Sequence, residues 1–273
     1  MKVEVYGNYH SPWVQAVLLG CHEKGFEYSL HSLPPRSVFK KWGVLMPAVS
    51  IDDGPWEIES SRILRNFGFD PISDIDLTAV RGAWRGVLHR PDNPLRFFAG
   101  FSRTADLSAS YEKQCVCNFF RSFIAFYMFI LINLVKLNPK MRDPEDFGDQ
   151  YLYWEGMLGS SDGAFIDGDH PGIRDIMLFG VVQCHSSIPV PPLEPLQNDR
   201  RLDRMRMWIA VMHEHFKEYP FLYSGQFFEP NLKQPASADF PQRGAFFLGL
   251  LSMFLAFPLT IPLVFILMRK VPR

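Results

Sequence analysis

The chain has 273 residues, of which 47% are hydrophobic, with 28 basic and 29 acidic residues and a formal net charge of -1. This length suffices for one large domain or two small ones, and the charge balance excludes nucleic-acid binding through a global positive field. The cysteines lack the paired spacing of a zinc site and the density of a disulfide-linked secreted fold, which indicates a reducing compartment. We therefore expect a globular protein that binds no nucleic acid and no metal. The cysteines are Cys21, Cys115, Cys117 and Cys184.

The first 70 residues carry alternating strand and helix signals. Residues 2–6 predict a strand without the apolar core of a signal peptide, so we expect a cytosolic N-terminus. A helix is predicted over 12–24, because apolar residues recur there at intervals of three and four. The order βαβ, connector, ββα is typical of a thioredoxin-like α/β domain, which we place at residues 1–70. The remaining predicted elements are strands at 27–33, 48–51 and 56–58 and a helix at 60–67.

Beyond Asp70 the strand signals end, and long helical segments predict an all-α domain over residues 77–225. The stretch Ser122–Val135 has 14 residues without charge, which is too short to cross a bilayer. We expect it to be a buried core helix; the alternative is a surface that rests on a bilayer or lines a channel for apolar substrates. Residues 226–243, rich in Pro, Gln and Ser, are expected to be a flexible linker. The predicted helices are 77–88, 108–135, 146–158, 173–184 and 199–219.

The 25 residues from Gly244 to Met268 contain no ionisable side chain, and basic residues flank them on both sides. A hydrocarbon core of about 30 Å needs about 20 helical residues, so this segment predicts one transmembrane helix, bent by its two prolines. Since the segment lies close to the end of the chain, we expect a single-pass tail anchor with the body facing the cytosol. The alternative is a buried terminal helix.

The segment Val5–Trp13, VYGNYHSPW, resembles the first strand and helix start of serine-type glutathione transferases. Ser11 and the proline after it predict a helix start, because serine is a preferred N-cap and proline a preferred first residue. The resemblance implies in addition that the Ser11 hydroxyl hydrogen-bonds the glutathione sulfur, at a helix N-terminus that lowers the pKa of the thiol. Tyr6 falls where tyrosine-type members carry their catalytic phenol, so Tyr6 and Tyr9 stay as alternatives to Ser11.

Three further motifs match the glutathione-binding residues of that family. Met46-Pro47 precedes the third strand, where the family carries a cis-proline whose preceding backbone pairs with the peptide of glutathione. Glu59-Ser60 matches the acidic residue and serine that bind the γ-glutamyl end. Lys40-Lys41-Trp42 is expected in the loop where family members place a cation or tryptophan for the glycyl carboxylate. The resemblance therefore implies that Met46, Pro47, Glu59, Ser60, Lys41 and Trp42 bind glutathione.

In the helical half, Phe165–Ile176 resembles the folding signature of the family, in which a Ser or Thr caps a buried helix and an Asp three residues later bonds back to it. Gly172 stands at the cap position here, so only Asp175 keeps its part of that motif.

The resemblance covers about residues 1–225 and implies the glutathione transferase architecture, with glutathione as co-substrate of a detoxification enzyme. The expected substrate is an apolar, lipid-soluble electrophile or peroxide, while peroxidase, isomerase and lyase reactions stay open. Expected partners are glutathione, an apolar small molecule or lipid, and the membrane, and the chain could form a homodimer. The alternative is a non-catalytic, tail-anchored adapter with a transferase-like body.

Overall fold

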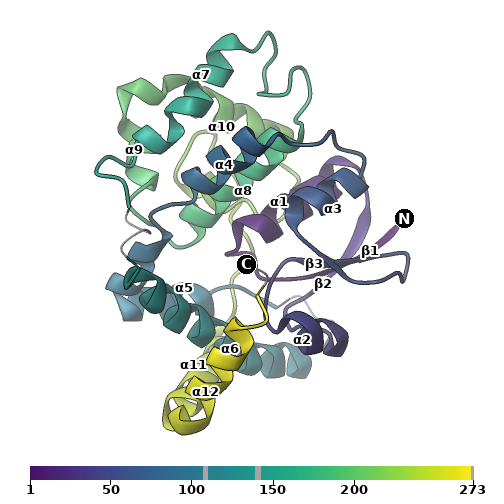
Figure 1. The fold of residues 1–273 in the computed structure, drawn as a ribbon, viewed down its shortest axis with the longest axis vertical. Helices are drawn as coiled ribbons and strands as arrows, with labels where there is room; N and C mark the ends of the chain where they lie inside the picture. Colours follow the sequence, from purple (N-terminus) through teal and green to yellow (C-terminus); the bar gives the residue numbers. More distant parts are fainter. Residues whose placement is uncertain (107–109, 139–142, 272–273) are drawn as a thin grey trace.

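The computed structural model describes residues 1–106, 110–138 and 143–271, and the chain begins with a small α/β unit (Figure 1). Its four strands form one mixed sheet in the order β2-β1-β3-β4, with β1 parallel to β2 and antiparallel to β3. This order confirms the predicted thioredoxin-like fold, although the expected connector contains a short helix, α2. The elements are β1 (Lys2–Tyr6), α1 (Pro12–Glu23), β2 (Glu27–His31), α2 (Arg36–Trp42), β3 (Ala48–Ile51), β4 (Glu57–Ile58) and α3 (Ser60–Asn66).

The sheet is covered on both faces, because successive side chains of a strand point in opposite directions. Val3, Val5 and Val49 belong to a core that includes residues of α1 and α3. Tyr6 and Ala48 belong to a second core on the other face, which includes residues of α2. We call these the first core and the second core.

All described elements after α3 are helices, as predicted. The helix expected over 108–135 is present as α6, with Ser110 as its N-cap, while Ser108 and Ala109 lie outside the described residues. The elements are α4 (Asp74–Ala83), η1 (Val87–Asp92), α5 (Pro94–Ser102), α6 (Tyr111–Lys136), η2 (Asp149–Tyr151), α7 (Leu152–Ser160), α8 (Ile173–Ser187), α9 (Leu193–Asn198), η3 (Arg200–Leu202), α10 (Asp203–His215) and η4 (Tyr223–Gln226).

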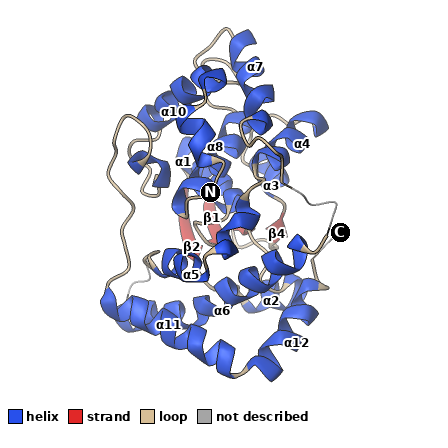
Figure 2. Ribbon diagram, turned by 90° about the vertical axis from the view of Figure 1, so that its left-hand side faces the viewer, coloured by secondary structure: helices blue, strands red, loops and turns tan. Residues whose placement is uncertain are grey.

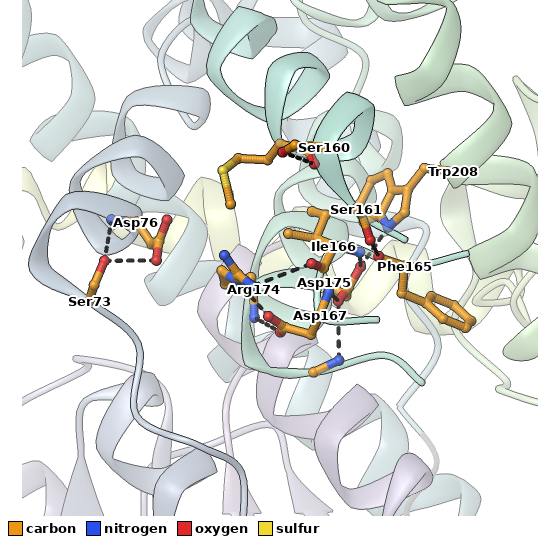
Figure 3. A network of polar contacts seen from close by, with 12 residues as sticks. Ser73, Asp76, Ser160, Ser161, Phe165, Ile166, Asp167, Arg174, Asp175 and Trp208 are labelled. Carbon is orange, nitrogen blue, oxygen red and sulfur yellow. Dashed lines mark hydrogen bonds and ion pairs between the residues drawn. The ribbon is translucent and has the colours of Figure 1, made fainter. Parts of the chain in front are cut away.

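Helix α8 joins the two halves of the molecule, lying against α1 (Figure 1). Gly180 permits this close packing, since a Cβ at that position would lie 2.5 Å from the carbonyl oxygen of Pro12. The start of α8 is held by the buried carboxylate of Asp175 (Figure 3). It accepts hydrogen bonds from the backbone nitrogens of Ile166, at 2.8 Å, and Gly172, at 3.1 Å, and from Trp208 Nε1 at 2.8 Å.

The C-terminal apolar segment is not the single helix expected over 244–268. It forms two helices, α11 (Phe240–Leu255) and α12 (Phe257–Met268), which meet at an angle of 95° (Figure 2). Helix α11 packs along α6, where a Cβ at Gly249 would lie 2.3 Å from the carbonyl oxygen of Phe119. Helix α12 reaches the end of α2, where a Cβ at Gly43 would lie 2.9 Å from Leu267 Cδ2. Residues of both helices complete the second core.

The segment expected to be a flexible linker also lies against the body. The Ala238 nitrogen donates to the carbonyl oxygen of Arg103 at 2.8 Å, and the Tyr111 hydroxyl donates to Asp239 Oδ2 at 2.9 Å. Just inside α11, Gln242 Oε1 accepts from Asn118 Nδ2 at 3.0 Å. These bonds tie the segment to the body.

Among the described residues, α6 is the one continuous helix long and apolar enough to cross a bilayer, and the bent pair α11–α12 would count as a second span only if taken together. Half of the apolar stretch of α6 is buried inside the protein, as in a core helix. The structure therefore does not support the predicted tail anchor, because its apolar residues contribute to the body of the protein.

Candidate active site

Three segments that matched the glutathione-binding motifs meet at one edge of the sheet. Tyr6 at the end of β1 pairs with Ala48 at the start of β3, and Ala48 pairs with Ile58 at the end of β4. The residues that follow β1, precede β3 and follow β4 therefore leave the sheet on the same side. The register thus places residues 7–11, 46–47 and 59–60 along a common edge.

Ser11 is the N-cap of α1, with extended backbone angles of φ -86° and ψ 128°, but its hydroxyl makes no capping hydrogen bond. Two other serines in N-cap positions do cap their helices: Ser73 accepts from the Asp76 nitrogen at 3.1 Å, and Ser110 from the Lys113 nitrogen at 3.3 Å. The partly exposed Ser11 side chain lines a cavity instead. Its hydroxyl is therefore available to a ligand.

The two tyrosines considered as alternatives are buried. The Tyr6 side chain is inaccessible to solvent, and its hydroxyl donates to the carbonyl oxygen of Val44 at 3.2 Å. Tyr9 packs its ring against Phe221, with 4.1 Å between centroids. Burial raises the pKa of both phenols. In this structure both tyrosines serve packing, and neither lines the cavity that contains Ser11.

The segment before β3 and the start of α3 contain backbone and hydroxyl groups without hydrogen-bond partners in the described chain. The Met46-Pro47 peptide bond is cis, and the Met46 backbone forms no hydrogen bond with any other described residue. Glu59 has a φ of 85°, a strained conformation for a residue other than glycine. Ser60 follows it and is buried, with no hydroxyl partner in the described part of the chain. These groups could bind the peptide backbone and the γ-glutamyl end of glutathione.

The predicted cationic connector lies at the end of α2, rather than in a loop. Lys41 is exposed, and its Nζ lies 4.1 Å from the centroid of the Trp42 ring. The carbonyl oxygen of Lys40 accepts a hydrogen bond from Lys270 Nζ at 2.8 Å. The end of the chain after α12 thus borders the proposed position of the glycyl carboxylate.

A cavity of about 180 Å³ lies between the thioredoxin-like half and the helices. Ser11 and Met46 lie on its wall, whereas Glu59, Ser60, Lys41 and Trp42 do not. The thioredoxin-like half contributes Asn8, His10, Ser11, Pro12, Trp13, Val44, Leu45 and Met46 to this wall, and the helical half contributes Trp84, Val87, Arg90, Phe97, Phe101, Ile124, Met128, Leu131, Ile132 and Cys184.

His10 and Arg90 are polar residues of this wall, as is Asn8, that were missed in the sequence. His10 is buried, and its Nε2 lies 2.7 Å from Thr104 Oγ1. Burial, together with the nearby charges of Arg90 and Arg121, lowers the pKa of His10 well below its usual range, so the ring is neutral. The one sequence signal for His10 was its position beside Ser11. Nothing in the sequence around Arg90 distinguishes this residue from a surface arginine.

Within the described residues, no group of three or more His, Cys, Asp or Glu side chains is arranged to hold a metal ion. His213 and His215 lie two residues apart in α10 and have different neighbours. His213 Nε2 lies 2.6 Å from Ser224 Oγ, and His215 Nε2 lies 2.6 Å from Glu23 Oε2.

No family model matches the sequence, and no curated protein matches it. Many solved structures resemble this one at low sequence identity. The tau class glutathione S-transferase of mango, Mangifera indica, is 15% identical, with a TM-score of 0.42 over 77% of this chain and 88% of that one. The theta class enzyme of Xanthomonas axonopodis pv. citri, solved with glutathione bound, is 13% identical, with a TM-score of 0.42 over 81% and 95%. Glutathione transferase F1 of poplar is 15% identical, with a TM-score of 0.43 over 78% and 92%. Similarity at this level does not define an activity, which must be argued from the residues of this chain.

Proposed function

We propose that the chain is a glutathione transferase in which the Ser11 hydroxyl stabilises the thiolate of bound glutathione. The observation that carries this proposal is that Ser11 holds an N-cap position without capping, while its side chain lines an apolar cavity beside Met46. A hydroxyl free of internal bonds can donate to sulfur, and the N-terminus of α1 favours negative charge there. Glutathione would lie along the sheet edge, held by the Met46 backbone, Glu59-Ser60 and the end of α2.

The cavity supports an apolar second substrate, because hydrocarbon and aromatic side chains form most of its wall. In the proposed reaction the glutathione thiol loses its proton to solvent, and the thiolate sulfur forms a bond to an electrophilic carbon. The electron pair displaced from that carbon moves to a leaving group or a conjugated acceptor, which then takes up a proton. The protein contributes positioning and a hydrogen bond that is strongest when the sulfur is charged.

The decisive experiment is a calorimetric titration of glutathione into the full chain, followed by thiolate absorbance against pH. Ser11→Ala should leave glutathione affinity nearly unchanged while raising the pKa of the bound thiol by about one to two units, since a hydrogen bond to a charged group contributes about 1.5–3 kcal/mol. Conjugation at neutral pH should slow accordingly.

Two variants make this test specific. Tyr6→Phe should not shift the thiol pKa, whereas Ser60→Ala should weaken glutathione binding by about 1–3 kcal/mol. A shift in Tyr6→Phe without one in Ser11→Ala would reassign the thiolate donor. Absence of glutathione binding to the wild-type protein would instead support the non-catalytic adapter.

We further propose that the α11–α12 pair lies in the plane of a membrane surface, on the cytosolic side, rather than spanning it. No ionisable residue occurs between Gly244 and Met268, and basic residues at either end suit anionic headgroups. A continuous exposed apolar surface of this kind is uncommon in soluble monomers. More than half of each of the side chains Leu248, Leu251, Leu255, Phe257, Leu259 and Ile266 is exposed.

The membrane proposal predicts that the wild-type protein floats with vesicles of phosphatidylcholine and phosphatidylserine. Leu259 is 76% exposed on α12, and Leu259→Glu should lower the vesicle affinity more than tenfold, because burial of a leucine contributes about 1.5–3 kcal/mol and a charge opposes it. Ile75 on α4 is 70% exposed and serves as the matched control, since Ile75→Glu should bind as the wild type does. Equal flotation of both variants would reject the α11–α12 surface as the membrane contact.

A further inference from the structure

Among the described residues, the wall of the cavity beside Ser11 contains one buried cation that lacks a counterion. Arg90 is only 6% exposed. Its guanidinium donates through Nη2 to the carbonyl oxygen and Sγ of Cys184, the latter at 3.2 Å, and its Nε has no partner in the described part of the chain. No Asp or Glu of the described ranges lines the cavity.

Arg90 thus forms no ion pair within the described residues, although it also lines a second pocket with Asp92 and Glu194. Removal of a guanidinium from water is costly unless an anion or a full set of hydrogen-bond acceptors replaces the solvent. Arg121, the other buried arginine of the described chain, does not line this cavity. The effect of the Arg90 charge extends to His10 on the same wall, where it contributes to the lowered pKa of the imidazole.

His10 adds a second nitrogen without a partner. Its Nε2 is paired with Thr104, whereas its Nδ1 forms no hydrogen bond within the described residues. The ring is neutral, so it brings no competing charge and can act as a donor from Nδ1 when Thr104 donates to Nε2. The polar part of the cavity, as far as the structure describes it, therefore has spare nitrogen groups but no acidic group.

The rest of the wall is apolar and sets the size of the ligand. Trp13, Phe97, Ile124 and Met128 are among the side chains that enclose the space. The volume of about 180 Å³ slightly exceeds the roughly 150 Å³ of a protein cavity that binds benzene. One aromatic ring, or a short hydrocarbon chain of similar size, would fill it.

We infer that this cavity binds an apolar carboxylate, with a hydrocarbon body of about the size of a phenyl group against the α6 side chains and its carboxylate beside Arg90. The inference rests on the proposed function, because it assigns this carboxylate as the second substrate of the proposed transferase. A bidentate hydrogen bond between a carboxylate and a guanidinium would supply the missing counterion. A neutral or cationic ligand of the same shape would leave Arg90 uncompensated.

The test compares two compounds that share a skeleton, 3-phenylpropanoate and 3-phenylpropanol. Each is titrated calorimetrically into the full chain at about pH 7.5 without glutathione, so that the result does not depend on glutathione binding or turnover. The acid should bind about tenfold or more tightly than the alcohol, as expected for a charge-assisted bond. Arg90→Met should abolish this preference and Arg90→Lys should retain part of it.

Arg96→Met provides the matched control, because Arg96 is an exposed arginine of the neighbouring helix and does not line the cavity. It should keep the wild-type preference for the acid. If Arg90→Met fails to fold, the wild-type comparison of acid and alcohol decides by itself. Equal affinity for the two compounds, no binding of the acid, or a preference that persists in Arg90→Met would overturn the inference. Loss of glutathione binding with the acid preference intact would instead contradict only the proposed transferase reaction.

Discussion

For Ser11 the sequence predicts the helix start but not the hydrogen bonding of its hydroxyl. Serine before proline predicts a helix start from local preferences alone, and α1 does begin there. Whether the hydroxyl caps the helix depends on its rotamer and on the surrounding cavity, which the sequence does not contain. The same holds for Arg90, whose bond to Cys184 joins residues 94 positions apart. Partners this distant follow from tertiary packing and could not be predicted from one sequence.

His185 in α8 makes stability depend on pH. Its Nε2 donates to the carbonyl oxygen of Ala83 at 2.9 Å, and burial lowers its pKa to about 3. The unfolded chain, with a histidine pKa of about 6.5, binds this proton more readily, so stability is lost as pH falls below that value. Between pH 7 and pH 5 this one residue should cost about 2 kcal/mol of unfolding free energy.

Urea unfolding at a series of pH values checks this expectation. His185→Gln keeps a side-chain N–H donor but cannot titrate, so its stability should fall less steeply between pH 7 and pH 5 than that of the wild-type protein. Identical slopes for the two proteins would show that His185 does not titrate on unfolding in this range.

At the level of elements, the thioredoxin-like half was predictable because its strands and helices carry clear periodicities. The strand at 48–51 has the predicted bounds, and α1 ends one residue before the predicted position. The C-terminal pair was not predictable in the same way. A helical segment that is apolar on all sides can lie in a bilayer or in a protein core. It has no polar face that would indicate which environment it occupies. The bend at Ala256 brings α12 back to α2, a contact that depends on residues more than 200 positions away.

Contact between α11 and α6 depends on the absence of a side chain at Gly249, since a Cβ there would lie 2.3 Å from a backbone oxygen. Gly249→Ala should destabilise the protein by about 1–3 kcal/mol through overpacking. A Cβ at Gly244 in the same helix would meet no described atom within 4 Å, so Gly244→Ala should be neutral or stabilising by up to about 1 kcal/mol.

Thermal or urea unfolding of the two alanine variants separates these cases, because both changes improve helix propensity and only one creates a clash. Equal stability of the two variants would mean that α11 does not pack closely on α6 in solution.

On the scale of the whole molecule, the two cores differ in how they are assembled. The first core draws on the thioredoxin-like half and on α8 and α10. The second core combines Tyr6 and Ala48 of the sheet with Phe97 and Phe126 and with Leu267 near the end of the chain. The C-terminal pair is thus structural in part, whatever its outer face contacts.

If the C-terminal pair were a detachable anchor, its removal would leave a soluble body. If it is part of the second core, its removal should expose apolar surface. Removal of residues 240–273 would uncover α6 and the second core, including Phe126, whose ring lies 5.1 Å from that of Phe254. The truncated protein should therefore be less soluble than the full chain and bind more of a hydrophobic dye. A truncated protein that stays soluble, unfolds cooperatively and binds little dye would restore the view of the C-terminal pair as an independent anchor.

The position of α12 also bears on how the protein is made. Domains commonly fold as they leave the ribosome, N-terminal parts first. Here Tyr6 is synthesised more than 250 residues before Leu267, yet both belong to the second core. That core cannot close before Leu267 has left the ribosome, so the nascent chain must keep one face of its sheet and much of α6 exposed until then. Cells that produce this protein would therefore need chaperones that shield apolar surface throughout elongation, and slowing translation should increase aggregation rather than improve the yield of folded protein.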